Sequence, residues 1–441
     1  MEKKATAKKT ASVIGHMARV VGKFLAPHLS KGLGSNRPPT MADWRNDPKP
    51  LPPALPFTPS ATVNPERQAG RHHIPSNLRK PYRILCLDGG GVRGMLTVCV
   101  LQRIVKKHPT FFDNVDAIVG TSAGGILSLL LSAGYTPDQC EKIFDFSMPH
   151  IFSHNPWRVI NPFRAKYSDK SKEELLRYFL GERKMVDLER TCTVIAFRLD
   201  GHKSKTHSFF HKEGWRPAIF SNMHKGDSNI TPDADLFAWE AAMSTSAAPT
   251  FFPVHRGYTD GGIVANNPSI VAISKAIAHL PNLSTRNIVL LSLGAGTYPR
   301  HTNIFSSSTR EGEVVIGKHG DKQIIKADWG IKQWIPFLLD LLLDGDSITS
   351  EMVMQYLLGA HGLYHRLDPQ LPRQIALDDV TAMPALVDFA ATVDMDETMR
   401  FIEMNFMDDY SSREEDGGNS LDTSSQYNEA WAKNIPPNGS R

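Results

Sequence analysis

A single serine stands between two glycines at Gly120-Thr121-Ser122-Ala123-Gly124, and apolar runs flank it on both sides. The run before it, Ala117 to Val119, is typical of a buried strand, and the run after it, Ile126 to Leu131, is typical of a buried helix. A strand that turns this sharply into a helix has no room for a Cβ beside the turn, a need that Gly120 and Gly124 meet. The pattern predicts a nucleophile elbow, which holds a serine hydroxyl out at the turn.

A second glycine-rich turn precedes the elbow by one predicted strand. Asp88-Gly89-Gly90-Gly91-Val92-Arg93-Gly94 follows the apolar run Arg83 to Leu87 and opens a predicted helix from Met95 to about Lys107. Glycines 89, 91 and 94 match the G-x-G-x-x-G fingerprint of dinucleotide binding, with Asp113 as the acid about twenty residues on. One alternative is therefore a nucleotide-binding oxidoreductase.

The other interpretation makes this loop an oxyanion hole, and we favour it. The ribose-binding acid of a dinucleotide fold ends the second strand, whereas Asp113 falls in a loop before that strand. Such a fold also has no use for a serine elbow on the next strand. Consecutive glycines let backbone N–H groups converge on one oxygen, a role that predicts Gly89, Gly90 and Gly91 as donors, with Arg93 holding the loop.

A nucleophilic serine needs a group that accepts its proton. None of the seventeen histidines has a distinctive context, and the nearest candidate is His255. Asp260 is the sharper candidate, because it stands on the glycine turn Tyr258-Thr259-Asp260-Gly261-Gly262 before Asn266-Asn267-Pro268, a turn and helix-start signal. An isolated Asp-Gly pair is most often a surface turn, so this candidate depends on the motifs around it.

Four motifs occur in the order D-G-G-G-V-R-G (88–94), G-T-S-A-G-G (120–125), S-T-S-A-A-P-T-F-F-P (244–253) and D-G-G (260–262). Together they resemble the patatin-like phospholipase family over about residues 82–300. The resemblance implies a three-layer α/β/α fold with a mainly parallel central sheet. It implies a catalytic dyad of Ser122 as nucleophile and Asp260 as proton acceptor, with the oxyanion hole at Gly89, Gly90 and Gly91. The supporting residues would be Arg93, Gly120, Gly124, Gly261 and Gly262.

The activity that this resemblance implies is lipid acyl hydrolysis. Members of the family cleave ester bonds of glycerolipids, often phospholipids, through an acyl-enzyme and without calcium, so no metal or other cofactor is expected. A lipid transacylase with the same dyad is one alternative, because only the acyl acceptor differs. A catalytically silent lipid-binding protein is another.

Composition divides the 441 residues into four segments. Residues 1–40 form a basic amphipathic arm, residues 41–81 a proline-rich linker, residues 82–405 the phospholipase-like domain, and residues 406–441 a polar, acidic tail of disordered composition. Within the domain, helical patterns near 171–181, 233–246, 268–280 and 348–360 alternate with strand-like runs at 116–119, 192–197 and 288–293, which is typical of an α/β fold. The apolar run 334–343 predicts either core or a lipid-facing cap.

The charge of the chain is concentrated in the arm. Eight Lys or Arg residues stand against one Glu in residues 1–40, whereas the remainder has 42 basic and 45 acidic residues. The near-neutral remainder argues against nucleic-acid binding. The arm predicts contact with an anionic membrane surface, and its composition also allows an organelle-targeting peptide, or a segment that packs on the body or stays disordered. No stretch approaches the ~18 apolar residues of a membrane span.

Four cysteines, Cys86, Cys99, Cys140 and Cys192, lack metal-site spacing and stand in apolar surroundings. They predict buried free thiols, as expected in a reducing compartment. The sequence as a whole predicts an intracellular, cytoplasmic protein that associates peripherally with membranes.

Overall fold

The computed structural model describes residues 41–44, 47–57, 81–153, 158, 161, 163–200, 214–223, 235–280, 283–298, 312–316, 322–327 and 331–407. The basic arm over 1–40 and the tail from residue 408 lie outside this part of the chain. No helix in the described ranges combines the length and the hydropathy of a membrane span.

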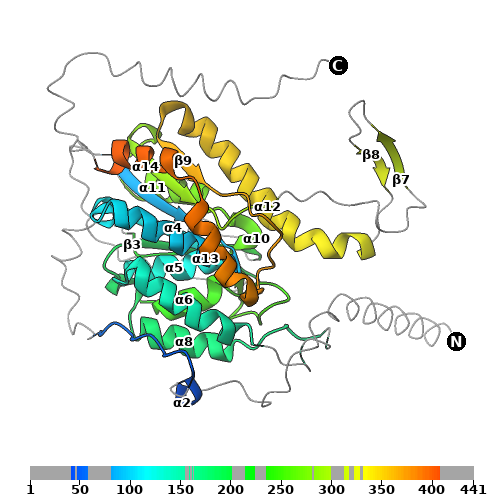
Figure 1. Cartoon of the computed structure of the whole chain (residues 1–441), viewed down its shortest axis with the longest axis horizontal. Coiled ribbons are helices and arrows are strands. Elements are labelled where there is room, and N and C mark those ends of the chain that lie inside the picture. The colour runs from blue at the N-terminus through cyan, green and yellow to red at the C-terminus, as the bar shows by residue number, and fades with distance from the viewer. Residues whose placement is uncertain are drawn as a thin grey trace.

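A mainly parallel sheet forms the centre of the molecule (Figure 1). Its strands are β1 Tyr82–Leu87, β2 Ala117–Thr121, β3 Thr191–Arg198, β4 Arg216–Ser221, β5 Tyr258–Asp260, β6 Ile288–Leu293 and β9 Tyr364–Leu367. The order is β4-β3-β2-β1-β6-β9, with parallel pairing from β3 to β9. Strands β4 and β5 both pair with β3 in the antiparallel direction. Parallel strands covered on both faces carry continuous apolar runs, which is why β1, β2 and β6 were predictable.

Helices cover both faces of the sheet. One layer contains α4 Gly94–Lys107, α5 Ser122–Ser132, α6 Pro137–Ile151, α8 Lys170–Leu180, α9 Ala238–Thr245 and α13 Met383–Thr392. The other contains α11 Ser269–His279 and the long helix α12 Ile331–Leu357. Side chains alternate along β1, so Leu85 and Leu87 pack into the first layer while Ile84 and Cys86 pack into the second. The predicted three-layer α/β/α fold is confirmed.

The remaining elements are short. They include α2 Met41–Trp44, α10 Gly262–Ala265, α14 Asp396–Ile402 and a π-helical turn at Glu403–Met407. Strands β7 Gly312–Ile316 and β8 Lys322–Ala327 form a separate antiparallel pair. The buried core reaches Phe406, close to the end of the described chain.

Two sequence expectations differ from the structure. The apolar run 334–343 and the helical pattern at 348–360 belong to one helix, α12, which continues through Gly345. The predicted linker 41–81 is described as far as residue 57, and this part packs on the domain. Trp44 is buried in the main core, the backbone N–H of Leu55 donates to the Tyr135 hydroxyl at 2.9 Å, and Arg183 donates to the carbonyls of residues 55 and 56.

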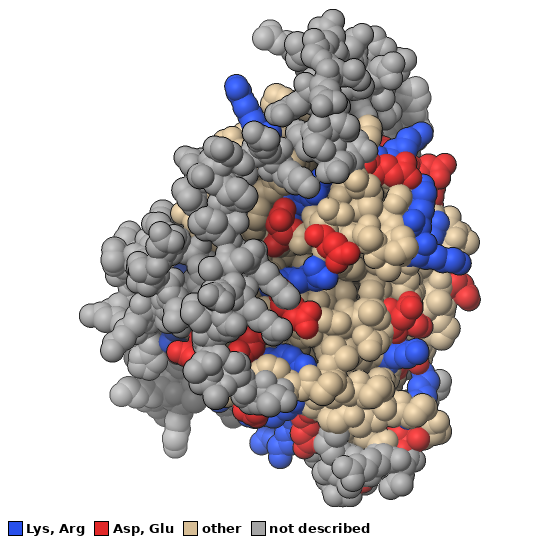
Figure 2. Space-filling model, turned by 90° about the vertical axis from the view of Figure 1, so that its left-hand side faces the viewer, with Lys and Arg blue, Asp and Glu red and all other residues tan. Residues whose placement is uncertain are grey.

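All four cysteines are buried and unpaired, as predicted. On the face shown in Figure 2, the described acidic and basic side chains lie intermixed, and neither sign gathers into one continuous patch. This agrees with the near balance of charge outside the arm.

Candidate active site

The serine turn has the strained geometry that the sequence predicts. Ser122 follows the last residue of β2 and begins α5, with a φ of 54°, a left-handed value that non-glycine residues rarely adopt. A Cβ on Gly120 would lie 2.3 Å from the carbonyl oxygen of Gly124, and one on Gly124 would lie 2.3 Å from that of Leu87. Both glycines are therefore required for close backbone packing around the turn.

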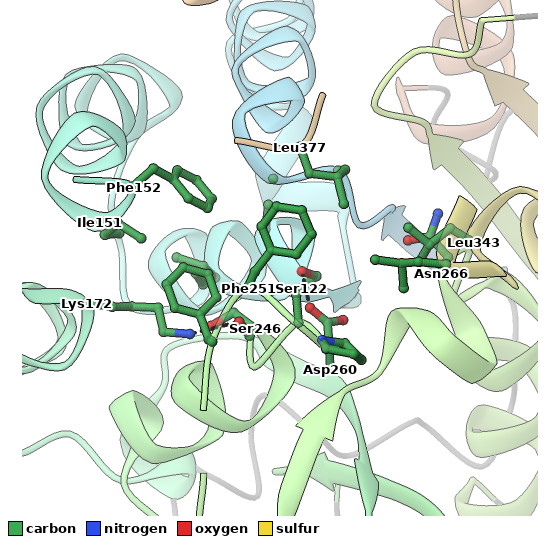
Figure 3. A pocket seen from close by; sticks show the side chains of 18 of the residues that line it. Ser122, Ile151, Phe152, Lys172, Ser246, Phe251, Asp260, Asn266, Leu343 and Leu377 are labelled. Carbon is green, nitrogen blue, oxygen red and sulfur yellow. Dashed lines mark hydrogen bonds between the residues drawn. The ribbon is translucent and has the colours of Figure 1, made fainter. Parts of the chain in front are cut away.

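Strand β3 brings Ser122 and Asp260 together. Thr121, at the end of β2, pairs with Ile195, while Asp260, at the end of β5, pairs with the next residue, Ala196. The Oγ of Ser122 donates a hydrogen bond of 2.6 Å to Oδ2 of Asp260 (Figure 3). Two residues 138 positions apart in the sequence thus meet because their strands flank β3.

Asp260 is held at both carboxylate oxygens and is 4% exposed. Its Oδ1 accepts the backbone N–H of Gly262 at 2.8 Å. Burial raises the pKa of the Asp260 carboxyl to about 6, and the hydrogen bonds from Ser122 and Gly262 and the charge of Lys172 limit the rise. A carboxyl with this pKa is ionised at neutral pH and is more basic than an ordinary aspartate. Gly261 is needed here because its Cβ would lie 2.2 Å from the carbonyl oxygen of Ile195.

Thr245, at the end of α9, holds the backbone of Ser122 by a hydrogen bond. Its Oγ1 accepts the backbone N–H of Ser122 at 2.9 Å and donates to the carbonyl of Ile195. Thr245 is fully buried. The sequence reasoning assigned it no role, although it lies in the S-T-S-A-A-P motif at 244–249.

One of the three predicted oxyanion donors in the glycine loop, Gly89, is already bonded within the protein. The N–H of Gly89 donates to the carbonyl of Asn266 at 3.1 Å, so it is already used within the protein, and Gly89 does not line the cavity beside Ser122. Gly90 and Gly91 do line that cavity. Gly91 has a φ of 58° and begins a short 3-10 helix, where an N–H has no acceptor within the helix. The oxyanion hole proposed for Gly89, Gly90 and Gly91 therefore reduces to the last two.

Arg93 contacts this loop through its side chain and its backbone. Its buried guanidinium donates to the carbonyl of Gly90 at 3.4 Å and to that of Gly296 at 3.0 Å. The backbone N–H of Arg93 also donates to the Gly90 carbonyl. Because a trans peptide points its N–H opposite to its carbonyl, fixing the Gly90 oxygen also fixes the direction of the Gly91 N–H.

A buried ion cluster anchors the strand end beneath the loop. Arg366 on β9 donates to Oδ2 of Asp88 at 2.7 Å and to Oδ2 of Asp368 at 2.6 Å. It also donates to the hydroxyl of Ser292 at 2.8 Å, and Glu351 on α12 lies 3.3 Å from its Nε. The sequence did not predict this cluster, because β9 carries no recognisable motif.

The cavity over the dyad has an empty volume of about 680 Å³, including its open mouth. Its walls are mainly apolar, and the apolar side chains in the lining include Ile126, Met148, Ile151, Phe152, Phe251, Phe252, Leu339, Leu343 and Leu377. Such a lining suits a hydrocarbon chain. Lys172 of α8 also lines the cavity, and its ammonium donates to the carbonyl of Ser246 at 2.8 Å and lies 3.8 Å from the centre of the Phe252 ring. Burial lowers the pKa of Lys172 to about 7.

Two other candidates from the sequence lie outside this arrangement. His255 is not among the residues that line the cavity. Asp113 lies in the 3-10 turn Phe111–Asn114 ahead of β2, which is the wrong end of that strand for a ribose-binding acid. Among the described residues, no group of three or more His, Cys, Asp or Glu is placed to hold a metal ion.

Comparison with known proteins gives a consistent picture. The sequence profile of the patatin-like phospholipase family matches residues 85–273, which include the glycine loop, Ser122 and Asp260. A cGAMP-activated phospholipase of Escherichia coli is 32% identical over 234 residues, which cover 48% of this chain and 61% of that protein. The 85/88 kDa calcium-independent phospholipase A2 of Mus musculus is 26% identical over 315 residues, which cover 68% of this chain and 37% of that protein.

Among solved structures, human GIVD cytosolic phospholipase A2 superposes with a TM-score of 0.31 at 10% identity, covering 78% of this chain and 63% of that one. The profile match and the sequence relatives agree with the motif order and with the three-layer fold. Residues 85–273 of this chain thus match the patatin-like phospholipase family.

Proposed function

We propose that this protein is a lipid acyl hydrolase of the phospholipase A or lysophospholipase type. The observation that carries the proposal is the 2.6 Å hydrogen bond from Ser122 to Asp260 at the base of an apolar cavity. The match to a family of ester hydrolases supports the reaction class. The relatives named as phospholipases support a glycerolipid as the substrate.

The reaction would proceed through an acyl-enzyme. The Oγ of Ser122 attacks the acyl carbonyl carbon as Asp260 accepts the serine proton, and the N–H groups of Gly90 and Gly91 stabilise the oxyanion. Asp260 returns the proton to the departing lysolipid or alcohol oxygen. A water molecule then loses a proton to Asp260 and attacks the acyl carbonyl carbon. The bond to Oγ breaks to release the fatty acid, and Asp260 passes the proton to Oγ, which restores Ser122.

Electrostatics and shape favour this use of the site. The raised pKa of Asp260 makes it a stronger base than an exposed aspartate while leaving it ionised at neutral pH. The positive end of α5 faces the turn that carries Ser122 and would favour developing negative charge. The apolar walls would receive the acyl chain and leave the polar head at the mouth.

The site has no need of a metal in this mechanism. The cellular setting that we propose is intracellular and cytoplasmic, with peripheral association at a membrane. The basic arm over residues 1–40 would contribute electrostatic attraction to anionic lipids, each Lys or Arg near the surface adding about 1 kcal/mol. That arm lies outside the described residues, so this part of the proposal depends on its charge alone.

The test is hydrolysis of a mixed panel of phospholipids, lysophospholipids and neutral lipids, with products identified by mass spectrometry. The wild-type protein is expected to release free fatty acid. Ser122→Ala and Asp260→Asn are each expected to lower kcat/KM at least a thousandfold, because each removes one half of a unit that acts together. Thermal unfolding checks that both variants remain folded.

Ser128→Ala is a matched control, since the Ser128 hydroxyl on the same helix donates to the carbonyl of Gly124 and does not line the cavity. It should retain activity within a few-fold of the wild type. Near-normal turnover by the Ser122 or Asp260 variant would remove the dyad assignment. Acyl transfer to a second lipid in place of free fatty acid release would change the acceptor and leave the dyad in place.

A further inference from the structure

The outward face of α12 is apolar, which reverses the usual pattern for a surface helix. Among the described residues fourteen large apolar side chains are exposed, and eight of these lie on this 27-residue helix. The exposed fraction reaches 50% at Leu341 and 66% at Ile348. We call these eight the outer stripe: Trp334, Leu338, Leu341, Leu342, Ile348, Met352, Tyr356 and Leu357.

Charged side chains are absent from the described exposed positions of α12 between residues 334 and 357. The acids of this segment, Asp340, Asp344, Asp346 and Glu351, occupy partly buried positions, although the side chain of Glu351 itself is 46% exposed. Two of them serve the protein interior, because Asp346 accepts the N–H of Asn267 at 3.1 Å and Glu351 lies 3.3 Å from Arg366. A contiguous apolar surface of this kind indicates an interaction site.

The inner side of the same helical turns belongs to the candidate active site. Leu339 and Leu343 line the cavity that holds Ser122, and Ser347 accepts a hydrogen bond of 3.0 Å from Nδ2 of Asn266. Figure 3 shows Leu343 beside Asn266 on one side of the dyad. A single helix therefore separates the outer stripe from the acyl cavity.

We propose that the outer stripe lies on the surface of a lipid bilayer, and that α12 is the element past which an acyl chain moves from the bilayer into the cavity. The proposal rests on the proposed lipid hydrolase function. From Trp334 to Tyr356 the stripe is roughly 33 Å long along the helix at 1.5 Å per residue, which is long enough for an extended contact with a bilayer surface. Aromatic side chains near its two ends are of the types that favour the membrane–water interface.

The absence of charge distinguishes this contact from attraction by the basic arm. An apolar stripe binds uncharged phosphatidylcholine and holds in high salt, since its free energy comes from removing hydrocarbon surface from water. Binding by a basic segment requires anionic lipid and weakens as salt screens it. Vesicle composition and salt concentration therefore separate the two contributions in the full-length chain.

The experiment compares the full-length protein with the variant Leu338→Gln/Leu341→Gln/Leu342→Gln. None of these three leucines lines the cavity, and glutamine preserves helix propensity. Phosphatidylcholine vesicles in high salt are expected to bind the wild type. They should bind the triple variant at least tenfold more weakly, because the three leucines that the bilayer would bury are replaced by polar side chains. Hydrolysis of vesicle lipid should fall with binding, while hydrolysis of a soluble short-chain ester stays within twofold of the wild type.

A matched control is Trp215→Gln/Ile277→Gln, which removes two exposed apolar side chains away from α12 and should leave vesicle binding unchanged. The proposal is overturned if the triple variant binds vesicles like the wild type, if the control loses binding equally, or if soluble-ester hydrolysis falls as well. It is also overturned if the wild type is a dimer in solution and the triple variant a monomer, since a second copy would then cover the stripe.

Failure of the proposed function has a different signature. In that case the wild type hydrolyses neither vesicle lipid nor the soluble ester, whatever its binding. Ser122→Ala should bind vesicles like the wild type and hydrolyse nothing, which shows that the stripe and the dyad act separately.

Discussion

Two buried cations, Arg366 at the strand end that leads into the glycine loop and Lys172 in the cavity wall, differ in their surroundings. Arg366, on β9, is neutralised by Asp88 and Asp368 and has Glu351 nearby. Lys172, on α8, is 2% exposed and donates to a backbone carbonyl over an aromatic ring, with no carboxylate paired to it in the described part of the chain. One charge is balanced within the fold, and the other is not.

The difference separates structure from function. A buried cation with matched carboxylates fixes strand ends and loops, as Arg366 does for the end of β1 that leads into the glycine loop. A buried cation without a paired carboxylate costs stability, so its presence points to a role in the site. The charge of Lys172 stabilises the ionised form of Asp260 across the cavity.

Removing the balanced cation should give the largest effect on stability. Arg366→Met leaves Asp88 and Asp368 buried without their counter-charge, a change that typically costs about 3–5 kcal/mol in the free energy of unfolding. Thermal unfolding should show a melting temperature lower by on the order of 10 °C. The deficit should be larger at pH 8 than at pH 5, because protonation relieves the stranded carboxylates. A stability within 1 kcal/mol of the wild type would contradict the anchoring role.

Asp260→Asn should raise stability at alkaline pH even as it abolishes activity. The pKa of Asp260 is raised from 3.8 to about 6 in the folded protein, so the proton binds more tightly to the folded state. Ionisation therefore costs stability that is absent below pH 4 and complete above about pH 6. At about 1.4 kcal/mol per pKa unit the cost is on the order of 3 kcal/mol.

Denaturant unfolding at pH 8 and pH 4 tests this expectation. The asparagine variant should be more stable than the wild type at pH 8, and the two should converge at pH 4. The same stability difference at both pH values would mean that the substitution acts through packing, in which case burial of the carboxylate does not set its pKa.

The sequence predicted the parts of the site that rest on steric necessity. A Cβ on Gly120, Gly124 or Gly261 would clash with a backbone oxygen, so these positions require glycine. The turn motifs are therefore recognisable in the sequence. The apolar runs of β1, β2 and β6 were predictable because both faces of those strands are covered. Features that depend on local steric constraints can be predicted from the sequence.

What the sequence could not predict depends on distant partners. The N–H of Gly89 donates to the carbonyl of Asn266, which is 177 residues away. The loop motif alone therefore predicts one oxyanion donor more than the structure leaves available. Lys172 and Arg366 hold their roles through contacts across the fold and have no short motif of their own. Thr245 lies in a motif, but its contact with Ser122 depends on how α9 packs against the serine turn. The sequence left the long apolar run of α12 open as either core or a lipid-facing cap, since only the folded arrangement decides which side of a helix faces solvent.

Removing the unbalanced cation should have the smallest effect on stability and a specific effect on catalysis. Lys172→Met keeps most of the side-chain volume and removes the charge. The pKa of Lys172 is lowered to about 7, so burial of the ammonium costs stability below that pH and the cost fades as pH rises toward 10.5. The variant should therefore be at least as stable as the wild type at pH 6, in contrast to Arg366→Met.

The catalytic readout is the acid limb of the pH profile of kcat/KM. In the wild type, activity should rise as Asp260 loses its proton near pH 6. The charges facing Lys172 are Asp260 across the cavity and Asp169 on the preceding turn, so losing the ammonium mainly disfavours ionised Asp260. We expect the acid limb to move upward by about half to one pH unit.

Lys170→Met is the matched control, because Lys170 is exposed at the start of the same helix and should leave both the limb and the stability unchanged. An acid limb that stays in place in Lys172→Met would make that lysine a packing element. A stability loss as large as that of Arg366→Met would place the two cations in one structural class. If the acid limb shifts and the variant stays stable, the charge of Lys172 keeps Asp260 ionised. A carboxylate paired with Lys172 would cancel that charge, which would explain why this lysine remains unpaired.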